Sequence, residues 1–236
     1  MKTAIMQPYL FPYIGYWQLI YATDVFVLLD DVNFIKRGFI NRNSILLNNK
    51  AHRFTIPLEK ASQNKLILDM KLNFPQKEKD RFLSTILSAY GKAPYFDTAF
   101  PMIKEIVCNP EDDLTEYIFH SIRQICAYLD IKKTFLRSSE MEKDNRLKAQ
   151  DRIIEICKRL GAGEYVNPCG GRALYCPEDF ARHGMKLYFL ESRMEQIFYP
   201  QFEPGWFVPS LSILDMLMFN PAEKIREFLN AYDLKD

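Results

Sequence analysis

The sequence predicts an α/β protein, with a mostly parallel sheet flanked by helices, a Rossmann-like N-terminal unit and a helical central region. Short apolar runs alternate with segments of helical periodicity through most of the chain. The run Val25-Phe-Val-Leu-Leu29 contains no polar residue, which is typical of a parallel strand covered on both faces. Residues 164–190 follow a compact strand, helix and strand pattern, as in a βαβ unit.

The N-terminal segment is predicted to form a strand, a loop, a helix and a second strand. Residues 3–7 have the pattern of a short strand, and Pro8 and Pro12 then break the chain into a loop. Residues 14–22 can form one short helix, and residues 25–29 form the second strand. Aromatic, carboxylate and guanidinium side chains gather in and after this unit, and these are the groups of a small-molecule site.

The central region is predicted to be mostly helical. Before it, residues 53–58 and 66–72 alternate enough to pair as a two-stranded ribbon. Helical periodicity then runs through residues 78–90, 94–107 and 114–129, and the acidic stretch before residue 114 suits a helix N-terminus. We expect these helices to pack on the sheet.

The C-terminal part is predicted to alternate between strands and helices. The expected order is strand 134–136, helix 147–160, strand 164–166, helix 177–183 and strand 186–190. Gly161 can end the first of these helices as its C-cap. Ser210 can cap an apolar helix that runs through Phe219, and Pro221 can begin the last helix at its first position.

Composition limits the classes of function. No compositional shift or linker divides the chain, so we expect a single domain over residues 1–236. No apolar run is long enough to span a membrane and no signal peptide is evident, so a cytoplasmic location is expected. The net charge of +1 excludes a global field for nucleic acid or an anionic membrane, although a local patch is compatible with it. The five cysteines contain no C-x-x-C pair and are expected to be reduced thiols.

Two carboxylates follow the second predicted strand. Asp30 and Asp31 would lie at its carboxyl end, where ligands bind in open α/β sheets. Because neighbouring strand residues point to opposite faces, only one of them is expected to face a pocket. Its partner would be a ligand hydroxyl or a hydrated Mg²⁺ ion. The alternative is that both acids open a turn.

A cluster of cations and amides comes next, formed by Lys36, Arg37, Asn41, Arg42 and Asn43. Guanidinium, ammonium and amide groups suit a phosphate or carboxylate, so an anionic small molecule is the expected partner. Apolar residues lie between these groups, and their burial would hold the polar side chains in place. The alternative is a solvated surface loop.

The opening aromatic block is a candidate for ring binding. Tyr9, Tyr13 and Trp17 follow Gln7 in and after the loop that the prolines break. Aromatic side chains in loops line pockets more often than they build cores, so we expect these three to stack on a ligand ring. The alternative is a purely structural aromatic core that needs no ligand.

The loop Asn167-Pro-Cys-Gly-Gly-Arg172 follows a predicted strand. The backbone of Gly170 and Gly171 could form an anion-binding nest, with Arg172 beside it. The loop matches neither the P-loop nor the dinucleotide fingerprint, and a plain turn is the alternative. Its cysteine, Cys169, would act as a nucleophile only with a base nearby, and His183 is the histidine nearest to it in the sequence.

Asp215 is the only charged residue in residues 211–219. A carboxylate in such an apolar helix must be paired, hydrogen-bonded or placed at an exposed edge. If the helix buries it, we expect a cationic partner such as Arg37, Arg42 or Arg172.

Four long motifs resemble the WbqC-like family. They are the opening block of residues 6–43, Tyr165-Val-Asn-Pro-Cys-Gly-Gly-Arg-Ala-Leu-Tyr175, Gly184-Met-Lys-Leu-Tyr-Phe-Leu190 and Pro209-Ser-Leu-Ser-Ile-Leu-Asp-Met-Leu217. The resemblance spans essentially the whole chain. It implies an association with bacterial surface-polysaccharide genes, including those of O-antigen biosynthesis.

The N-terminal unit also resembles the start of the HIGH-motif nucleotidyltransferases. In that superfamily two loop histidines stabilise the triphosphate during adenylyl transfer. Here the comparable stretch is Phe11-Pro-Tyr-Ile-Gly-Tyr16, and its aromatic residues cannot supply an imidazolium charge. The resemblance therefore implies the fold of that unit but not its reaction.

Two hypotheses of function follow. The first is a transferase of surface-polysaccharide precursor metabolism that moves an acyl, aminoacyl or nucleotidyl group to or from a nucleotide-activated sugar. The second is a non-catalytic protein that binds a nucleotide-sugar or organises pathway enzymes. In the enzyme hypothesis phosphates are bound by Arg37, Arg42 and Arg172, a hydroxyl or Mg²⁺ by Asp30 or Asp31, and a ring by Tyr9, Tyr13 and Trp17. Neither hypothesis fixes a substrate, a cofactor or an oligomeric state.

Overall fold

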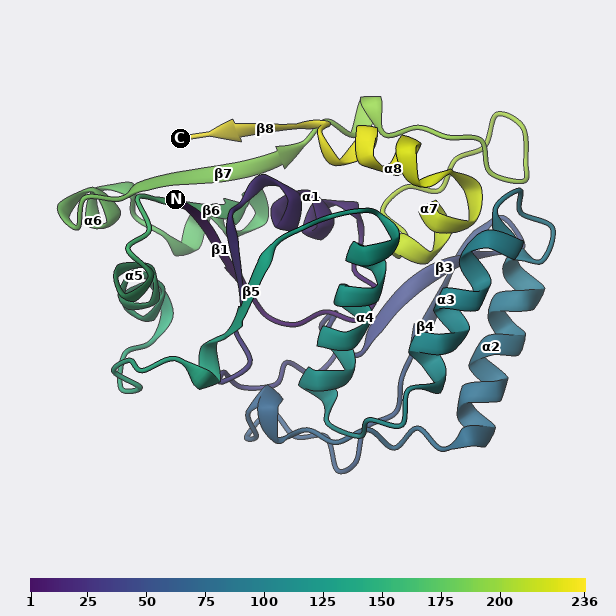
Figure 1. Ribbon diagram of the computed structural model, residues 1–236, viewed down its shortest axis with the longest axis horizontal. Coiled ribbons are helices and arrows are strands. Elements are labelled where there is room, and N and C mark those ends of the chain that lie inside the picture. The colour runs from purple at the N-terminus through teal and green to yellow at the C-terminus, as the bar shows by residue number, and fades with distance from the viewer.

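The computed structural model describes residues 1–236 and is built around a six-stranded sheet (Figure 1). The order across the sheet is β5 (Thr134–Arg137), β2 (Val25–Leu28), β1 (Lys2–Met6), β6 (Glu164–Pro168), β7 (Lys186–Ser192) and β8 (Tyr232–Lys235). The first five strands are parallel, and β8 runs antiparallel to β7. This confirms the predicted α/β class with a mostly parallel sheet.

The strand order reverses direction between β1 and β6. From β1 the chain builds outward to β2 and β5 on one side, and from β6 it builds outward to β7 and β8 on the other. β1 and β6 pair only at their first residues, Lys2 with Glu164 and Thr3 with Tyr165, whereas β6 and β7 pair over the whole of β6. The carboxyl ends of β1 and β6 therefore separate, and in an open α/β sheet this is where ligands bind.

Helices cover both faces of the sheet. On one face lies α1 (Ile14–Ala22), whose first seven residues are all buried because the sheet is on one side and α8 (Ala222–Leu229) on the other. α4 (Leu114–Tyr128) joins this face through Phe119, whose ring centroid is 5.8 Å from that of Phe135 in β5.

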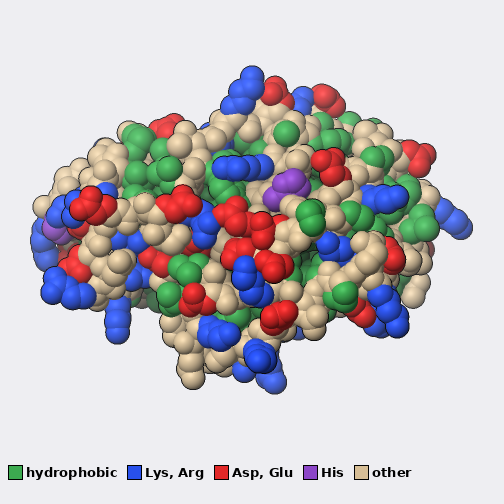
Figure 2. All heavy atoms as spheres, turned by 60° about the horizontal axis from the view of Figure 1, so that its bottom comes forward, with side chains coloured by type: hydrophobic (Ala, Val, Ile, Leu, Met, Phe, Trp, Pro, Cys, Tyr) green, Lys and Arg blue, Asp and Glu red, His purple; other side chains and the backbone are tan.

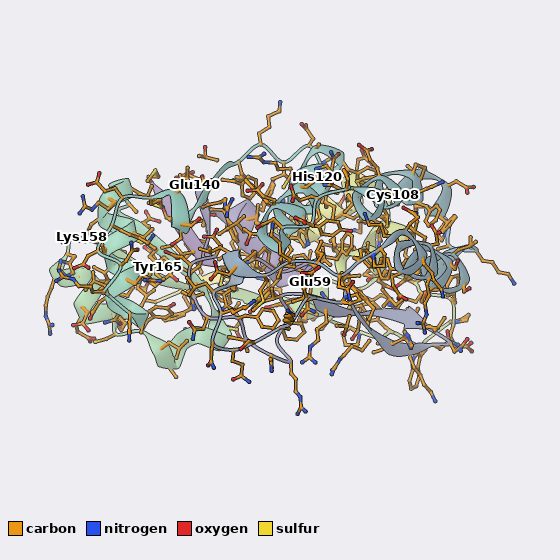
Figure 3. All side chains as sticks on the ribbon, turned by 90° about the horizontal axis from the view of Figure 1, so that it is seen from below. Glu59, Cys108, His120, Glu140, Lys158 and Tyr165 are labelled. Atoms are coloured by element: carbon orange, nitrogen blue, oxygen red, sulfur yellow. The ribbon has the colours of Figure 1, made fainter.

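The other face packs against α5 (Ala149–Leu160) and α6 (Pro177–Arg182). Here Tyr165 of β6 stacks on Phe180 of α6, with ring planes only 2° apart. Figure 3 shows Tyr165 enclosed within this part of the molecule while Lys158 of α5 lies at its outer edge. Gly161 ends α5 in the left-handed conformation, φ 66°, as the sequence predicted.

A second part of the molecule is built on a hairpin, β3 (Arg42–Leu47) and β4 (Lys50–Thr55). α2 (Gln76–Tyr90), α3 (Phe96–Cys108) and α7 (Ile213–Phe219) pack together beside it (Figure 1). The predicted central helices are confirmed, but α2 and α3 pack mainly on the hairpin and α7 and not on the main sheet. One apolar core of 55 residues is continuous through both parts.

The predicted ribbon between residues 53–58 and 66–72 is wrong. β4 pairs with β3, because Asn48 and Asn49 both adopt positive φ and make the tight turn that joins them. Residues 67–69 form a single 3₁₀ turn, and only the isolated bridge between Leu58 and Leu72 joins the two segments expected to pair.

Smaller corrections concern the C-terminal part. Ser212, and not Ser210, caps α7 by accepting a hydrogen bond from the backbone N–H of Leu214. Pro221 lies one residue before α8, and the sequence analysis missed β8 altogether. None of the helices has both the length and the apolar character needed to cross a membrane.

Acidic and basic side chains are interspersed on the face that Figure 2 shows, in keeping with the near-neutral net charge.

Candidate functional site

A large cavity opens where β1 and β6 separate. Its volume is about 890 Å³, and its walls include the last residues of β1, β6 and β7 and the loops that follow them. This volume lies within the range of small-molecule sites. The lining residues come from segments 5–15, 29–39, 167–175 and 190–194.

The aromatic wall comes from the loop after β1. The ring of Phe39 lies 6.0 Å from that of Tyr9 and 6.4 Å from that of Tyr13, and all three line the cavity. The loop is held from behind, because the carbonyl of Phe11 accepts hydrogen bonds from Asn43 Nδ2 (2.7 Å) and from Ser212 Oγ (2.8 Å). The aromatic faces are thus fixed before any ligand arrives.

Gly15 at the start of α1 is required for this wall. A Cβ atom there would lie 2.7 Å from Cε2 of Tyr13 and 3.3 Å from Oγ of Ser192, and both residues line the cavity. The absence of a Cβ atom at Gly15 therefore lets the edge of the Tyr13 ring approach the first turn of α1 closely.

The opposite wall is the loop after β6. Asn167 is buried, its Oδ1 accepts a hydrogen bond from the hydroxyl of Tyr165 at 3.1 Å, and its Nδ2 donates to the carbonyl of Pro168. Gly171 is packed so closely over this amide that a Cβ atom would collide with Nδ2. Burial raises the pKa of Tyr165 well above its ordinary value, so its hydroxyl stays a neutral donor.

The cavity wall is almost uncharged. No lysine, arginine or histidine lines it, and the only carboxylate, Glu191, pairs with Lys235 at 2.5 Å. Burial, followed by the nearby phenol or thiol, raises the pKa of Tyr9 and Tyr13, so both hydroxyls are neutral. Aromatic faces with amide and hydroxyl groups suit a neutral ring that carries hydroxyls.

Cys169 lies on this wall and is exposed, but no base accompanies it. His183 follows α6 and is not among the lining residues. Figure 3 shows Lys158 at one end of the molecule, Cys108 towards the other end and His120 between them. The arrangement therefore contains no cysteine–histidine pair.

The two carboxylates after β2 do not line the cavity, although the preceding residue, Leu29, does. Asp30 has no exposed surface, and its oxygens accept hydrogen bonds from Arg137 Nε (2.9 Å) and from the backbone N–H (3.0 Å) and Oγ (2.7 Å) of Ser139. These contacts join the end of β2 to the last residue of β5 and to the segment that follows it. The carboxylate is fully occupied by its own chain.

Asp31 is held in a similar way. It pairs with Lys143 Nζ at 2.7 Å, accepts a hydrogen bond from Ser138 Oγ at 2.6 Å, and lies 3.6 Å from Arg152 Nη1. Burial acts to raise the pKa of Asp31, but the hydrogen bonds from Lys143 and Ser138 and the two positive charges outweigh it and hold that pKa below its ordinary value. Carboxylates paired in this way do not fit a Mg²⁺ ion, and no cluster of three or more potential metal ligands occurs elsewhere.

The amides of the cationic cluster bind backbone carbonyls. Asn41 Nδ2 donates to Ile56 at 2.7 Å, and Asn43 Nδ2 donates to Phe11. Arg42 Nε donates to the carbonyl of Gly38 at 2.7 Å. Arg42 forms no ion pair with a carboxylate, and burial together with the charges of nearby Arg53 and Arg37 lowers its pKa.

The remaining predicted site residues are divided between core and surface. Trp17 is fully buried and donates through Nε1 to the carbonyl of Pro12 at 3.0 Å. Lys36 and Arg37 are exposed on the loop between Ile35 and Phe39. The guanidinium of Arg172 lies over the ring of Phe189, 4.7 Å from its centroid.

The structure therefore brings together only part of the predicted set. Six of the predicted residues lie on the cavity wall: Gln7, Tyr9, Tyr13, Asn167, Gly170 and Gly171. The cavity wall does not include Asp30, Asp31, Trp17, Lys36, Arg37, Asn41, Arg42, Asn43 or Arg172. Sequence reasoning missed Phe39, Tyr175, Glu191 and Ser192 as wall residues. The last two follow the predicted strand over 186–190, so the rule that ligands bind beyond strand ends was the available signal.

The prediction that a buried Asp215 would have a cationic partner is wrong. Asp215 has no exposed surface, but its partners are neutral: Tyr90 at 2.9 Å, Tyr199 at 2.6 Å and Gln201 at 2.8 Å. Burial raises its pKa, although the three hydrogen bonds oppose that effect. Asp215 ties α7 to α2 and does not reach the cavity.

Comparison with known proteins shows to which family the chain belongs. The sequence profile described as the WbqC-like protein family matches residues 7–227. The chain belongs to the WbqC-like protein family. The match covers every wall of the cavity except its β1 residues Ile5 and Met6.

One curated relative of this WbqC-like chain is the "Uncharacterized protein Rv1507c" of Mycobacterium tuberculosis (strain ATCC 25618 / H37Rv). It is 24% identical over 233 residues, which are 97% of each chain. No solved structure matches. The resemblance of the N-terminal unit to HIGH-motif nucleotidyltransferases accordingly stays a prediction.

Proposed function

We propose that this WbqC-like protein is a transferase of bacterial surface-polysaccharide precursor metabolism. In this proposal a nucleotide-activated sugar binds at the cavity between β1 and β6, and an acyl, aminoacyl or nucleotidyl group is transferred to or from it. The observation that carries the proposal is the cavity itself, which combines aromatic faces, amides and hydroxyls at the point where the strand order reverses.

The sugar ring is assigned to the interior of the cavity. Tyr9 and Tyr13 offer aromatic faces to the apolar side of such a ring, and the side chains of Gln7 and Ser192 offer groups that hydrogen-bond to its hydroxyls. An interior without a cation is a poor place for a diphosphate, because a buried anion needs a positive partner or several hydrogen-bond donors.

The phosphates are assigned to the edge of the cavity. Arg172 belongs to the same loop as Gly170 and Gly171, and Arg42 is held against the loop that carries Phe39. Both guanidinium groups lack a carboxylate partner, so they are free to bind an anion. The ion pairs of Asp30 and Asp31 lead us to leave these two carboxylates out of the proposed site.

A non-catalytic binding protein is the second candidate, and one observation favours it. The cavity wall carries no histidine, and its one carboxylate is paired with Lys235, so no general base is evident. In the transferase hypothesis, rate acceleration would come mainly from positioning and electrostatic stabilisation.

A cavity-filling substitution tests the location of the site. Gly170 lines the cavity, and a Cβ atom there would meet no other atom within 4 Å. Gly170→Phe should fold normally and fill part of the cavity. Gly163→Phe is the matched control, because that glycine is equally unobstructed but lies outside the cavity.

The full-length protein and both variants would be titrated with a panel of nucleotide-sugars. They would then be incubated with the same panel plus ATP, acyl-CoA and Mg²⁺, and new products sought by mass spectrometry. We expect binding and turnover by the unmodified protein and by Gly163→Phe, with both lost in Gly170→Phe. Binding without turnover would refute the transferase and support the second candidate, whereas equal binding by both variants would refute the cavity as the site.

A further inference from the structure

The mouth of the cavity is unusually apolar. Ile35, Phe39, Leu174 and Met194 line it, and these residues are 52%, 51%, 70% and 37% exposed. They make up four of the nine large hydrophobic residues that the chain exposes. Scattered exposed hydrophobic residues need no explanation, but a group around one opening indicates an interaction surface.

Exposed cations are interleaved with these apolar residues. Lys36 and Arg37 lie between Ile35 and Phe39, and Arg172 lies two positions before Leu174. None of the three forms an ion pair, and the only carboxylate on the cavity wall is neutralised by Lys235. We call these seven residues (Ile35, Lys36, Arg37, Phe39, Arg172, Leu174 and Met194) the rim. The rim is locally basic although the chain as a whole carries a net charge of only +1.

We propose that the rim docks on the surface of a lipid bilayer that contains anionic lipids. Apolar side chains that alternate with cations along one short loop reach the same depth of an interface, where the former enter the acyl boundary and the latter meet the phosphates. A small ligand inside the cavity would not account for Leu174, which is 70% exposed.

Charge complementarity selects an anionic bilayer as the occupant. A second copy of this chain would present the same cations to one another, because the rim has no unpaired carboxylate to meet them. Docking of this kind is peripheral, and it turns the mouth of the cavity towards the membrane. An amphiphilic substrate could then pass from the bilayer to the cavity without crossing water.

This inference is independent of the proposed transfer reaction, because membrane docking needs no sugar ligand. The test is flotation of the full-length protein with vesicles of phosphatidylcholine, with and without phosphatidylglycerol, at low and high salt. We expect flotation only with the anionic vesicles, weakened by salt because charges in the headgroup region are screened.

Rim variants assign the docking surface. Lys36→Gln with Arg37→Gln should lower the partition coefficient about thirtyfold, since each cation near an anionic surface contributes roughly 1 kcal/mol. Phe39→Ser should lower it about tenfold through the loss of an inserted ring. The control is Arg81→Gln with Leu87→Ser on α2, where an exposed cation, 4.0 Å from Glu78, and an exposed apolar residue lie on a helix that does not line the cavity.

Insertion depth gives a second readout. In a Trp206→Phe background, Leu174→Trp should shift to bluer emission on addition of anionic vesicles and be quenched by brominated lipid. Equal flotation with neutral vesicles, full binding by the rim variants, or a dimer in solution that Phe39→Ser dissociates would each overturn the inference. Sugar binding by a protein that does not float would leave the proposed function standing and refute the docking surface alone.

Discussion

Replacing Asp31 with asparagine is expected to destabilise the fold without involving the cavity. The substitution removes the negative charge that faces Lys143, whose side chain is only 1% exposed, and leaves that ammonium group uncompensated. Removing one partner of a buried pair costs about 3–5 kcal/mol. The 11% exposure of Asp31 and the remaining hydrogen bond from Ser138 place the expected loss at the low end, about 3 kcal/mol.

Urea unfolding at neutral pH measures this loss through a lower midpoint at unchanged slope. Adding Lys143→Met should recover at least half of it, because the buried ammonium is then gone and the other cation near Asp31, Arg152, keeps its hydrogen bonds to backbone carbonyls. Asp144→Asn is the control: its partner Arg146 is 91% exposed, so the midpoint should stay the same. A loss below about 1 kcal/mol would refute the reasoning. If the Asp31→Asn protein is stable but no longer binds ligand, Asp31 belongs to the ligand-binding site.

The same ion pair predicts an acid-dependent loss of stability. In the folded protein the pKa of Asp31 lies below its ordinary value, so the unfolded chain binds the proton more tightly. The stabilisation is complete above the ordinary pKa of an aspartate and is lost as the pH falls through the lowered folded value. Asp31→Asn should therefore flatten the acid limb of the stability profile.

Three further predictions concern the cavity and α7. Gly15→Ala should displace the Tyr13 ring, weaken ligand binding and cost about 1–2 kcal/mol of stability. Gly163→Ala should change neither ligand binding nor stability. Calorimetric titration measures the binding and urea unfolding measures the stability. The pKa of the Asp215 carboxyl is raised in the folded protein, so its contribution to stability is full below the ordinary pKa of an aspartate and is lost as the pH rises through the folded value. Asp215→Asn should therefore make the Tm depend less on pH over that window. Arg42→Ala should weaken nucleotide-sugar binding about tenfold if it binds a phosphate, and unchanged affinity in the same titration would exclude it.

Sequence reasoning worked best where local signals agree. The unbroken run of β2, the amphipathic pattern of α5 with its terminal glycine and the periodicity of α2 to α4 each specify an element from a few neighbouring residues. It failed at the β3–β4 hairpin, because the turn at Asn48 and Asn49 was overlooked and the Arg42–Asn43 segment was interpreted as a binding loop.

Only some of the predicted site residues line the cavity, because others form ion pairs or hydrogen bonds within the fold. Asp30 and Asp31 lie where the sequence placed them, directly after β2, but Arg137 at the end of β5 and Lys143 on the segment after it pair with them. Asn41 and Asn43 had the right chemistry for a ligand, but backbone carbonyls took up their amide donors. A single sequence does not show which partner a polar group meets, because most of these partners are distant along the chain.

The sequence by itself determined the α/β class, the order of most elements and the presence of aromatic and amide groups near strand ends, since these depend on periodicity and short-range chain geometry. Only the tertiary structure decided that β1 and β6 pair at their first residues and then separate, which opens a cavity of about 890 Å³ between them. It also decided that Ile35 and Leu174, far apart in sequence, line the mouth of that cavity while exposed. Strand pairing and loop convergence depend on contacts across the whole chain, which no local pattern records.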